Sequence, residues 1–492
     1  MRTRTHLLTT VVALLATFGA GAPVTPAASI PDRPEQLVYP PLRFDPPRAA
    51  DYRHEIGDVV VYLAPTHEFP LVQLTMTFRG GSYLDPPHRT GLAQATGAML
   101  RRGGTTSLIP KVLDDRFDDL AALAATGAGD TTSFASLNAL SSNFDRAFAL
   151  FMDMLRTPAF DEARFATYQA EVIERLRQRN DTIGAVLGRE WDGLMYGADS
   201  YLGRQPVLDD VQGMTIEDLR SMHATIFHPG NLVIAVSGDF EPDAMLATLR
   251  AALADWAPGP PVADPPDVPH DVEPGVRAVE KDFPQAGVSI GMRGIRRDDP
   301  DRLAIMVMNQ ILGGNGFSSR IMQRVRSDEG LTYGAGSSMS APVWHDGEFR
   351  VGFQSRNENV ALAATIILEE IERMRTTLVG DDELSLAKDS FIETFPRAFE
   401  SRDAMLGIFV DDEITGRAPD YWSTYRDRLR AVTADDVSRV ARAQLHPYRM
   451  AMLVVGRWAM IEAGDADGRA SMKDLFGGRV EHLPLRDPLT LK

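Results

Sequence analysis

One segment of the chain occurs twice, and this internal repeat constrains the fold more than any other feature. Residues 215–229 and residues 433–447, which lie 218 positions later, each begin with threonine, continue with acidic residues and end in His-Pro. Each copy predicts a helix with a threonine N-cap. Each is followed by an apolar run that ends in glycine, at Gly238 and Gly456. A cap, a turn and a strand that recur at one offset indicate two related halves.

The rest of the pattern predicts that each half mixes sheet and helices. Residues 72–80 and 288–294 alternate between apolar and polar side chains, which is typical of half-buried strands. In the first half we expect a strand at 59–63 and helices at 90–102, 111–126, 142–155 and 162–180. Strands and helices do not alternate strictly, so we expect α+β halves, each a layer of antiparallel-rich sheet and helices, rather than a parallel doubly wound sheet.

A proline-rich stretch, residues 257–269, separates the halves and can form neither a helix nor a central strand. We read it as part of an extended linker. The predicted organisation is a signal peptide at 1–28, a first half at 29–255, the linker at 256–276, a second half at 277–460 and a polar C-terminal extension at 461–492.

The N-terminus predicts export. Arg2 and Arg4 precede a short apolar run, Leu7 to Phe18, and small residues follow it. This order is typical of a cleaved secretory signal, with the cut near Ala27 to Ser29; an uncleaved anchor is the alternative. We therefore expect the mature protein to cross the inner membrane and to lie in the periplasm, without a membrane span of its own.

Composition excludes several kinds of chemistry. The chain has 492 residues, no cysteine and a formal net charge of −17. Without cysteine there are no disulfides, no thiolate catalysis and no Cys-ligated metal centre. The acidic balance argues against nucleic acid as the main partner, and solubility is the simplest reading of it.

Common catalytic motifs are also missing. No two histidines have the i, i+4 spacing that places both on one metal-facing side of a helix. His228 and His446 hold equivalent places before the repeated prolines, which favours a structural role in the turn. The glycine-rich run Leu312 to Phe317 follows a predicted helix at 301–311 rather than a strand, so we read it as a turn near a peptide-binding cleft, not as a phosphate loop.

Residues 310–333 carry the strongest functional signal. They predict a glycine turn, a short amphipathic helix, a stop at Gly330 and the start of a strand. Arg326 falls in the last turn of this helix, and Tyr333 follows seven residues later. A guanidinium fork and a phenol at this spacing can meet one extended peptide backbone. The plainer alternative is an arginine favoured by the helix dipole and a tyrosine that begins a strand.

These segments resemble the pitrilysin/insulinase-type zinc metallopeptidases, or inverzincins. The resemblance covers nearly the whole mature chain. Its motifs include residues 78–82, 91–93, 126–128, 155–160, 232–239, 311–314 and 325–333. The order of these motifs and the two-half layout carry the resemblance more than any single motif does.

The resemblance implies that the zinc motif has been lost here. In active members a helix carries His-x-x-Glu-His, whose histidines bind zinc and whose glutamate is the general base. The five matching positions read Gln, Ala, Thr, Gly, Ala from Gln94 to Ala98, with Gly97 at the place of the base. The third ligand aligns with Arg175, although Glu171 and Glu174 lie close by. We therefore expect no metal in this chain and no peptide cleavage by it alone.

The resemblance also implies that the second half has kept its role. Active members use an arginine and a tyrosine, seven apart, to grip the substrate backbone and polarise the scissile carbonyl; Arg326 and Tyr333 match them. Candidate cleft-lining residues nearby are Gly313, Gly314, Asn315 and Phe317.

The resulting hypothesis is a non-catalytic, substrate-binding subunit of a heterodimeric zinc metallopeptidase. The complex would degrade unstructured peptides outside the cytoplasm, and a zinc-motif-bearing partner of the same family would supply zinc and the general base. The alternative is a non-enzymatic peptide-binding or scaffold protein with a peptidase-like fold. A third reading, an active enzyme with displaced ligands, requires metal ligands that the motif does not offer.

Overall fold

The structure, a computed structural model, describes residues 33, 37, 43–465 and 467–492. The predicted signal peptide lies outside these residues. Residues 45–492 form one compact unit, and the description below concerns this unit. Among the described residues, no helix is long and apolar enough to cross a membrane.

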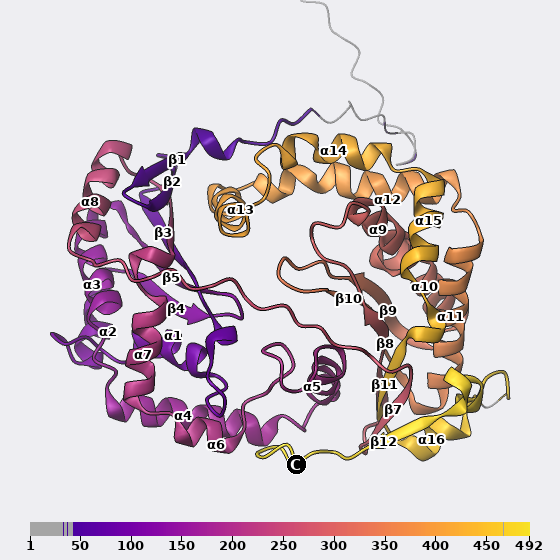
Figure 1. The fold of residues 1–492 in the computed structure, drawn as a ribbon. Coiled ribbons are helices and arrows are strands. Elements are labelled where there is room, and N and C mark those ends of the chain that lie inside the picture. The colour runs from indigo at the N-terminus through magenta and orange to yellow at the C-terminus, as the bar shows by residue number, and fades with distance from the viewer. Residues whose placement is uncertain (1–32, 34–36, 38–42, 466) are drawn as a thin grey trace, which may run out of the picture. The chain divides into compact units, whose positions relative to one another are not determined.

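Two six-stranded sheets organise the unit, one in each half, and five of the six strands in each follow one topology (Figure 1). The first sheet has the order β1-β2-β6-β3-β5-β4, and the second has the order β12-β7-β11-β8-β10-β9. The strands of the first half are β1 Arg53–Ile56, β2 Val59–Pro65, β3 Leu71–Arg79, β4 Leu123–Ala128, β5 Thr132–Leu140 and β6 Leu232–Gly238. Those of the second half are β7 Gly275–Glu280, β8 Gln285–Arg293, β9 Thr332–Met339, β10 Glu348–Arg356, β11 Ala451–Gly456 and β12 Val480–Leu483.

Strand directions correspond between the halves. β2 pairs in parallel with β6, and β7 pairs in parallel with β11, while β3–β6, β3–β5 and β5–β4 are antiparallel like their counterparts in the second sheet. The outer strand beside each parallel pair differs between the sheets. In the first sheet it is β1, which directly precedes β2 in the chain, and in the second it is β12, which comes from the C-terminal segment. The predicted fold class, two related α+β halves, is confirmed.

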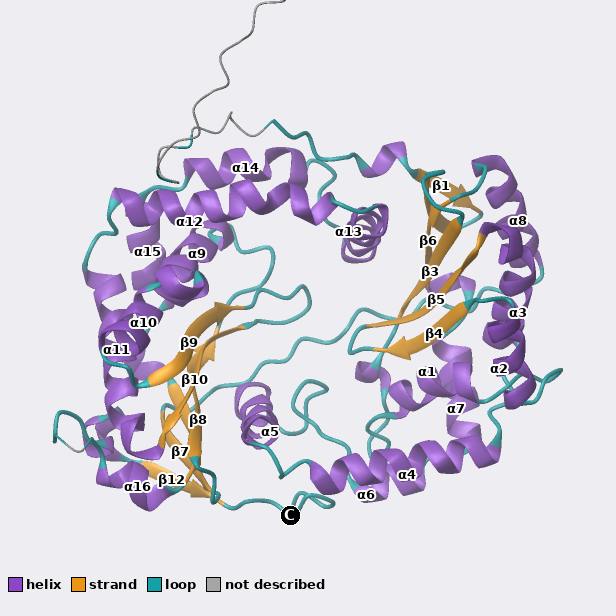
Figure 2. Ribbon diagram, turned by 180° about the vertical axis from the view of Figure 1, so that it is seen from behind, coloured by secondary structure: helices purple, strands orange, loops and turns teal. Residues whose placement is uncertain are grey.

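Helices cover the outer face of each sheet (Figures 1 and 2). The helices of the first half are α1 Leu92–Arg102, α2 Pro110–Asp119, α3 Phe144–Arg156, α4 Glu162–Gln178, α5 Ile183–Tyr196, α6 Leu208–Gly213, α7 Ile216–Ile226 and α8 Pro242–Ala254. Those of the second half are α9 Arg302–Asn309, α10 Arg320–Met322, α11 Val360–Thr376, α12 Asp381–Thr394, α13 Arg402–Thr415, α14 Tyr421–Ala431, α15 Ala434–Gln444 and α16 Trp458–Ala463. The main core of the first half lies between the sheet and the outer helices α1, α2, α3, α7 and α8.

The sequence repeat forms the same structure twice, as predicted. The Thr215 hydroxyl caps α7 by accepting from the Asp218 N–H, and Thr433 caps α15 by accepting from Asp436. In both caps the aspartate side chain accepts from the threonine N–H, which completes a capping box. The ring Nε2 of His228 lies 3.1 Å from the carbonyl oxygen three residues earlier, and that of His446 lies 3.0 Å from its equivalent. The structural role predicted for these histidines is confirmed.

The two halves exchange a helix across the space between their sheets (Figure 1). α5 belongs to the first half, yet its Trp191 and Val186 pack with β7 and β11 of the second sheet. α13 belongs to the second half, yet its Leu406 and Phe409 pack on β2 and β6 of the first sheet. α5 and α13 begin 219 residues apart, close to the offset of the repeat. The sequence patterns did not reveal this exchange, because it depends on tertiary contacts alone.

One predicted helix is wrong at its C-terminal end. The expected helix 111–126 ends at Asp119, and Leu123–Ala128 forms β4 instead. Ala121 adopts a positive φ of 48°, which stops the helix. β4 then pairs along its whole length with β5. Alanine-rich sequence favours a helix by propensity, so this is a case where the sheet overrides a local preference.

The linker and the C-terminal segment both join the halves. The linker passes between the two sheets, where the Tyr83 hydroxyl donates to the carbonyl of Ala263. After β12 the chain returns to the first half, and Arg486 forms an ion pair of 2.6 Å with the buried carboxylate of Glu190. The N–H of Leu208 donates to the carbonyl of Leu489 at the C-terminal end. The halves therefore hold each other through exchanged helices, linker and tail.

Candidate functional site

The degenerate zinc motif lies in the first turns of α1. Asp85 builds the start of this helix: its two carboxylate oxygens accept from the N–H groups of Gly91 and Ala93, each at 2.8 Å. Gly91 takes a φ of 95°, which favours glycine. Asp85 is buried, and this burial raises the pKa of its carboxyl to about 6, although the two N–H donors oppose the shift.

The helix that carries the degenerate motif packs closely on the sheet. Ala95 and Thr96 are fully buried, and the Thr96 hydroxyl donates to the Leu92 carbonyl. At Gly97, where active relatives have the general base, a Cβ atom would lie 2.7 Å from the backbone carbon of Gly127 in β4. A glutamate here would collide with the sheet unless α1 moved. The close packing of α1 on β4 therefore depends on the glycine at position 97.

Arg175 and Gln94 line one cavity of about 520 Å³ in the first half, which we call the α1–α4 cavity. The two neighbouring glutamates do not line it. Glu171 pairs with Arg102 at 2.7 Å, and Glu174 pairs with Arg177 at 3.1 Å. An amide and a guanidinium cannot replace imidazole and carboxylate ligands of zinc. Over the described residues no group of three or more metal-ligating side chains occurs. The residues present do not fit a zinc site.

The Arg326 segment is wound more loosely than an ordinary α-helix. α10 continues as a π-helical stretch from Gln323 to Asp328, and Gly330 then takes a φ of 63° before β9 begins at Thr332. π-helical turns often occur at functional sites. The predicted order of helix, glycine stop and strand is therefore found, with Arg326 in the last turn of the helix and Tyr333 on β9.

Arg326 lies between two exposed aromatic rings. Its guanidinium carbon is 4.3 Å from the ring centre of Phe317 and 4.9 Å from that of Tyr333. Phe317 is 68% exposed and Tyr333 is 89% exposed. Its neighbours Arg320 and Arg324 pair with Glu383 and Glu370, whereas no ion pair or side-chain hydrogen bond of Arg326 is found among the described residues. Its donors are therefore held in place by the rings and remain available.

The other candidate cleft residues differ in role. Gly313 is buried, and a Cβ there would meet Ser337 of β9 at 2.4 Å, so this glycine allows close packing. Gly314 is exposed, but a Cβ would lie 2.9 Å from the side chain of Gln310. Asn315 accepts from the Gln310 amide at 3.2 Å, a contact that shapes the turn. Phe317 is the member of this group whose ring packs against the guanidinium of Arg326.

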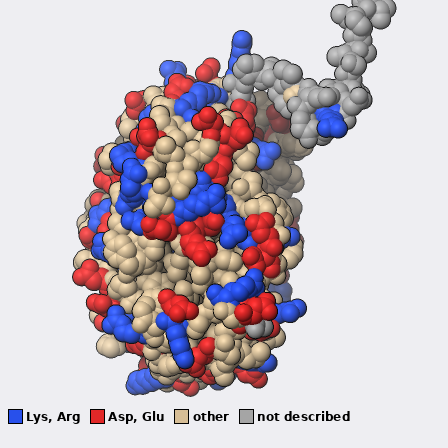
Figure 3. Space-filling view, turned by 90° about the vertical axis from the view of Figure 1, so that its right-hand side faces the viewer, with Lys and Arg blue, Asp and Glu red and all other residues tan. Residues whose placement is uncertain are grey.

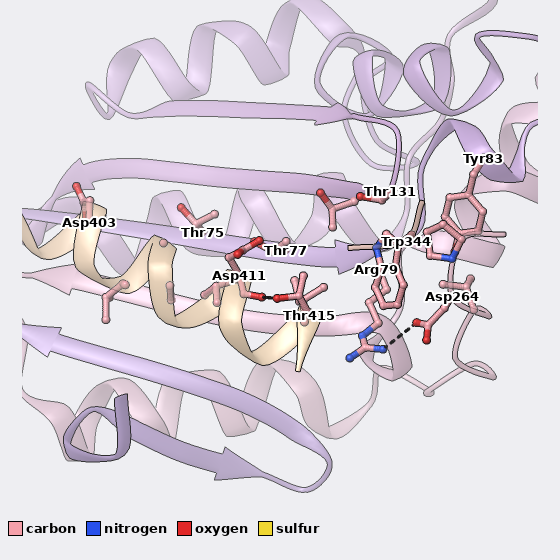
Figure 4. A pocket seen from close by; sticks show the side chains of 18 of the residues that line it. Thr75, Thr77, Arg79, Tyr83, Thr131, Asp264, Trp344, Asp403, Asp411 and Thr415 are labelled. Carbon is pink, nitrogen blue, oxygen red and sulfur yellow. Dashed lines mark hydrogen bonds and ion pairs between the residues drawn. The ribbon is translucent and has the colours of Figure 1, made fainter. Parts of the chain in front are cut away.

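A second cavity, of about 290 Å³, was not anticipated from the sequence; we call it the α13 cavity. Figure 4 shows it between α13 and β3, with Thr75, Thr77 and Asp411 along it and Arg79, Trp344 and Asp264 at one end. Arg79 and Asp264 form an ion pair of 3.6 Å across that end. No local motif marks these residues, because the helix exchange and the linker bring them together.

Charges of both signs are mixed on the face of the molecule that Figure 3 shows. On the side shown in Figure 3, the blue Lys and Arg and the red Asp and Glu are interspersed. Many charged side chains of the described residues form ion pairs on the surface, such as Arg439 with Asp301 at 2.6 Å. That the net charge of −17 serves solubility stays a prediction.

Comparison with known proteins identifies the family. The family described as the peptidase M16 inactive domain matches residues 213–391, which include Arg326 and Tyr333. Residues 213–391 are therefore a peptidase M16 domain of the inactive kind. The resemblance to pitrilysin/insulinase-type peptidases is thereby confirmed, with this chain among the M16 proteins related to inactive members.

Some proteins similar to this chain are named zinc proteases, and another is named a non-peptidase homologue. An uncharacterised zinc protease of Streptomyces coelicolor is 28% identical over 312 residues, which cover 62% of this chain and 67% of that protein. The non-peptidase homologue YmxG of Helicobacter pylori is 24% identical over 397 residues, or 78% of this chain and 89% of that protein. The crystal structure of a peptidase M16 inactive domain from Pseudomonas fluorescens has the same fold, with a TM-score of 0.73, 24% identity and coverage of 82% of this chain and 97% of that one.

Proposed function

We propose that this M16 protein is the substrate-binding subunit of a heterodimeric zinc metallopeptidase. The observation that carries the proposal is the arrangement at Arg326, whose unpaired guanidinium is held between Phe317 and Tyr333. The α1 motif cannot supply catalysis, since Gln94, Gly97 and Ala98 offer neither zinc ligands nor a base. A partner of the same family that keeps the zinc motif would supply zinc and the base. The ligands of the metal would then come from that partner and not from this chain.

The chemistry of the pair suits an extended peptide. An arginine presents several N–H donors in a fixed plane, which can hold one or two backbone carbonyls of a substrate. The Tyr333 hydroxyl can donate to the oxygen of the scissile carbonyl, where negative charge develops during attack by water. Because the rings fix the guanidinium before substrate arrives, less side-chain entropy is lost on binding. Unstructured peptides fit this role, since their backbone groups are free to pair.

We place the complex in the periplasm on two grounds. The N-terminal sequence is typical of a secretory signal. A protein of similar fold, PqqL of Escherichia coli, is a periplasmic protease; it aligns at a TM-score of 0.65 and 16% identity over 82% of this chain and 46% of that one. The proposal for this chain rests mainly on the first of these.

The test uses the mature chain and a zinc-motif M16 protein from the same source. Hydrolysis of a quenched fluorescent peptide is measured for each protein alone and for the mixture. We expect activity that requires both, and a loss of roughly 100-fold in kcat/KM for Arg326→Ala and for Tyr333→Phe, as for removal of a donor to a developing oxyanion. Arg356→Ala, an exposed arginine at the end of β10 with no ion pair among the described residues, is the matched control and should keep full activity.

A second candidate function is a non-enzymatic peptide-binding or scaffold protein. The similarity to a non-peptidase homologue favours it. In that case the mixture would show no more activity than the zinc-motif protein alone, and Arg326→Ala would change peptide binding without changing turnover. Co-elution of the two proteins in size-exclusion chromatography separates a failed assembly from an inactive complex.

A further inference from the structure

His228 joins the first copy of the repeat to the linker. Its ring Nδ1 accepts from two backbone N–H groups, that of Gly230 at 3.1 Å and that of Gly259 in the linker at 3.0 Å. Its Nε2 lies 3.1 Å from the carbonyl oxygen of Thr225. A carbonyl can only accept, so the ring proton belongs on Nε2 and Nδ1 carries the lone pair. The contacts therefore select one neutral tautomer of a side chain that is only 5% exposed.

The linker passes this ring at contact distance. A Cβ at Gly259 would lie 2.8 Å from Nε2 of His228, and a Cβ at Gly230 would lie 2.3 Å from the carbonyl oxygen of Gly259, so both positions need glycine. Asn231 adds a second attachment, because its side-chain oxygen accepts from the N–H of Val262 at 2.9 Å. We call His228, Gly230, Asn231, Gly259 and Val262 the linker clasp.

The second copy of the repeat lacks the residues of the clasp. His446 holds the place of His228, but Tyr448 and Arg449 stand where the first copy has glycine and asparagine. The ring of His446 is half-buried, and its Nδ1 lies 3.4 Å from the Tyr448 hydroxyl instead of accepting from a linker N–H. Both copies thus share the helix and the turn, whereas the contact with the linker belongs to the first copy.

Charged groups lie near the clasp without pairing with His228. His223 precedes it on α7, and burial lowers the pKa of both rings. Arg79, which faces the linker, pairs with Asp264. Among the described residues, the side chain of His228 contacts backbone groups and the Asn231 amide, and no carboxylate there stabilises an imidazolium. Four charged side chains line the cleft beside the linker: Asp58, Arg79, Arg250 and Glu413.

The clasp also positions one wall of the α13 cavity. Val262 and the three linker residues after it line that cavity. The Tyr83 hydroxyl holds the next residue, Ala263, through its carbonyl oxygen at 2.6 Å. A linker released at the clasp would withdraw Val262 from this wall, so the state of His228 bears on access to the space between the two sheets.

We propose that the linker clasp is a pH-sensitive latch, which holds the linker while His228 is neutral and releases it when the ring takes up a second proton. A proton on Nδ1 would point at the two N–H groups that now donate to this atom, so the bonds to Gly230 and Gly259 would be lost. In the released state the ring meets water, where the ordinary pKa of a histidine is about 6.5.

Linkage gives the direction of the effect. The released state binds the proton more readily than the clasped state, because the clasp lowers the pKa of His228. The latch therefore has its full stability above about pH 6.5 and loses stability relative to the released state as the pH falls below that value.

The experiment measures amide hydrogen exchange of residues 257–265 in the mature chain at about pH 7.5 and about pH 5.5, corrected for the intrinsic pH dependence of exchange. We expect protection of the Gly259 and Val262 amides to fall about tenfold over this interval, since opening is linked to protonation of one histidine. His446→Asn, in the copy without a clasp, is the matched control and should behave as the wild type.

Two variants test the latch from its two sides. His228→Asn keeps a side-chain acceptor near the place of Nδ1 but has no group that takes up a proton, so its protection should be the same at both pH values. Gly259→Ala places a Cβ 2.8 Å from Nε2 of the ring, so this segment should already exchange freely at the higher pH.

Three results would overturn this inference. The wild type could be equally protected at both pH values, or His228→Asn could lose protection in acid as steeply as the wild type, which would assign the titrating group to another residue such as His223. Gly259→Ala could also stay as protected as the wild type, which would mean that other contacts hold the linker. If His228→Asn does not fold, the wild type and Gly259→Ala still decide. These measurements need neither a partner nor Arg326, so their outcome is independent of the proposed subunit function.

Discussion

At the scale of single residues, Gly97 shows why the lost motif cannot simply be restored. A Cβ at this position would lie 2.7 Å from the Gly127 backbone, so Gly97→Glu should force α1 away from β4 and lower the free energy of unfolding by about 1–3 kcal/mol. The control is Gly184→Glu in the first turn of α5, where the structure leaves open space. Urea unfolding of both variants measures the difference. If the two variants were equally stable, α1 would accommodate a glutamate at position 97. The glycine found there would then need another explanation. The sequence could predict the chemical loss at Gln94, Gly97 and Ala98, because it depends only on residue type. It could not predict that Arg179, Arg204 and Tyr201 share a cavity with Gln94, because no spacing rule links those positions.

At the scale of elements, the capped helices and the main strands were predictable and the exchanged helices were not. α7 and α15 carry their own start signals, whereas β4 lies in an alanine-rich run whose conformation is decided by its pairing with β5. The role of α13 can be tested at Phe409, which is 1% exposed and whose ring lies 5.7 Å from that of Tyr62 on β2. Phe409→Ala should cost about 3–5 kcal/mol of unfolding free energy, because it removes the aromatic anchor of α13 on the first sheet. Arg402→Ala, at the exposed start of the same helix, serves as control and should change stability by less than about 0.5 kcal/mol. A small effect of Phe409→Ala, measured by denaturant unfolding, would mean that the exchanged helix contributes little to holding the halves together.

At the scale of the whole unit from residue 45 to 492, the two halves are held by contacts that do not depend on an intact linker. α5 packs on the second sheet, α13 packs on the first, and Arg486 of the tail pairs with Glu190 of the first half. A protease recognition sequence inserted between Pro265 and Pro266, both in the irregular linker, allows this to be tested after folding. We expect the two fragments to co-elute in size-exclusion chromatography after cleavage, because both exchanged helices stay buried in the opposite half. The same cleavage in Phe409→Ala should let the fragments separate at a lower urea concentration, since one of the two helix contacts is weakened while α5 and the tail remain. Separation of the wild-type fragments without denaturant would show that the linker itself holds the halves in place.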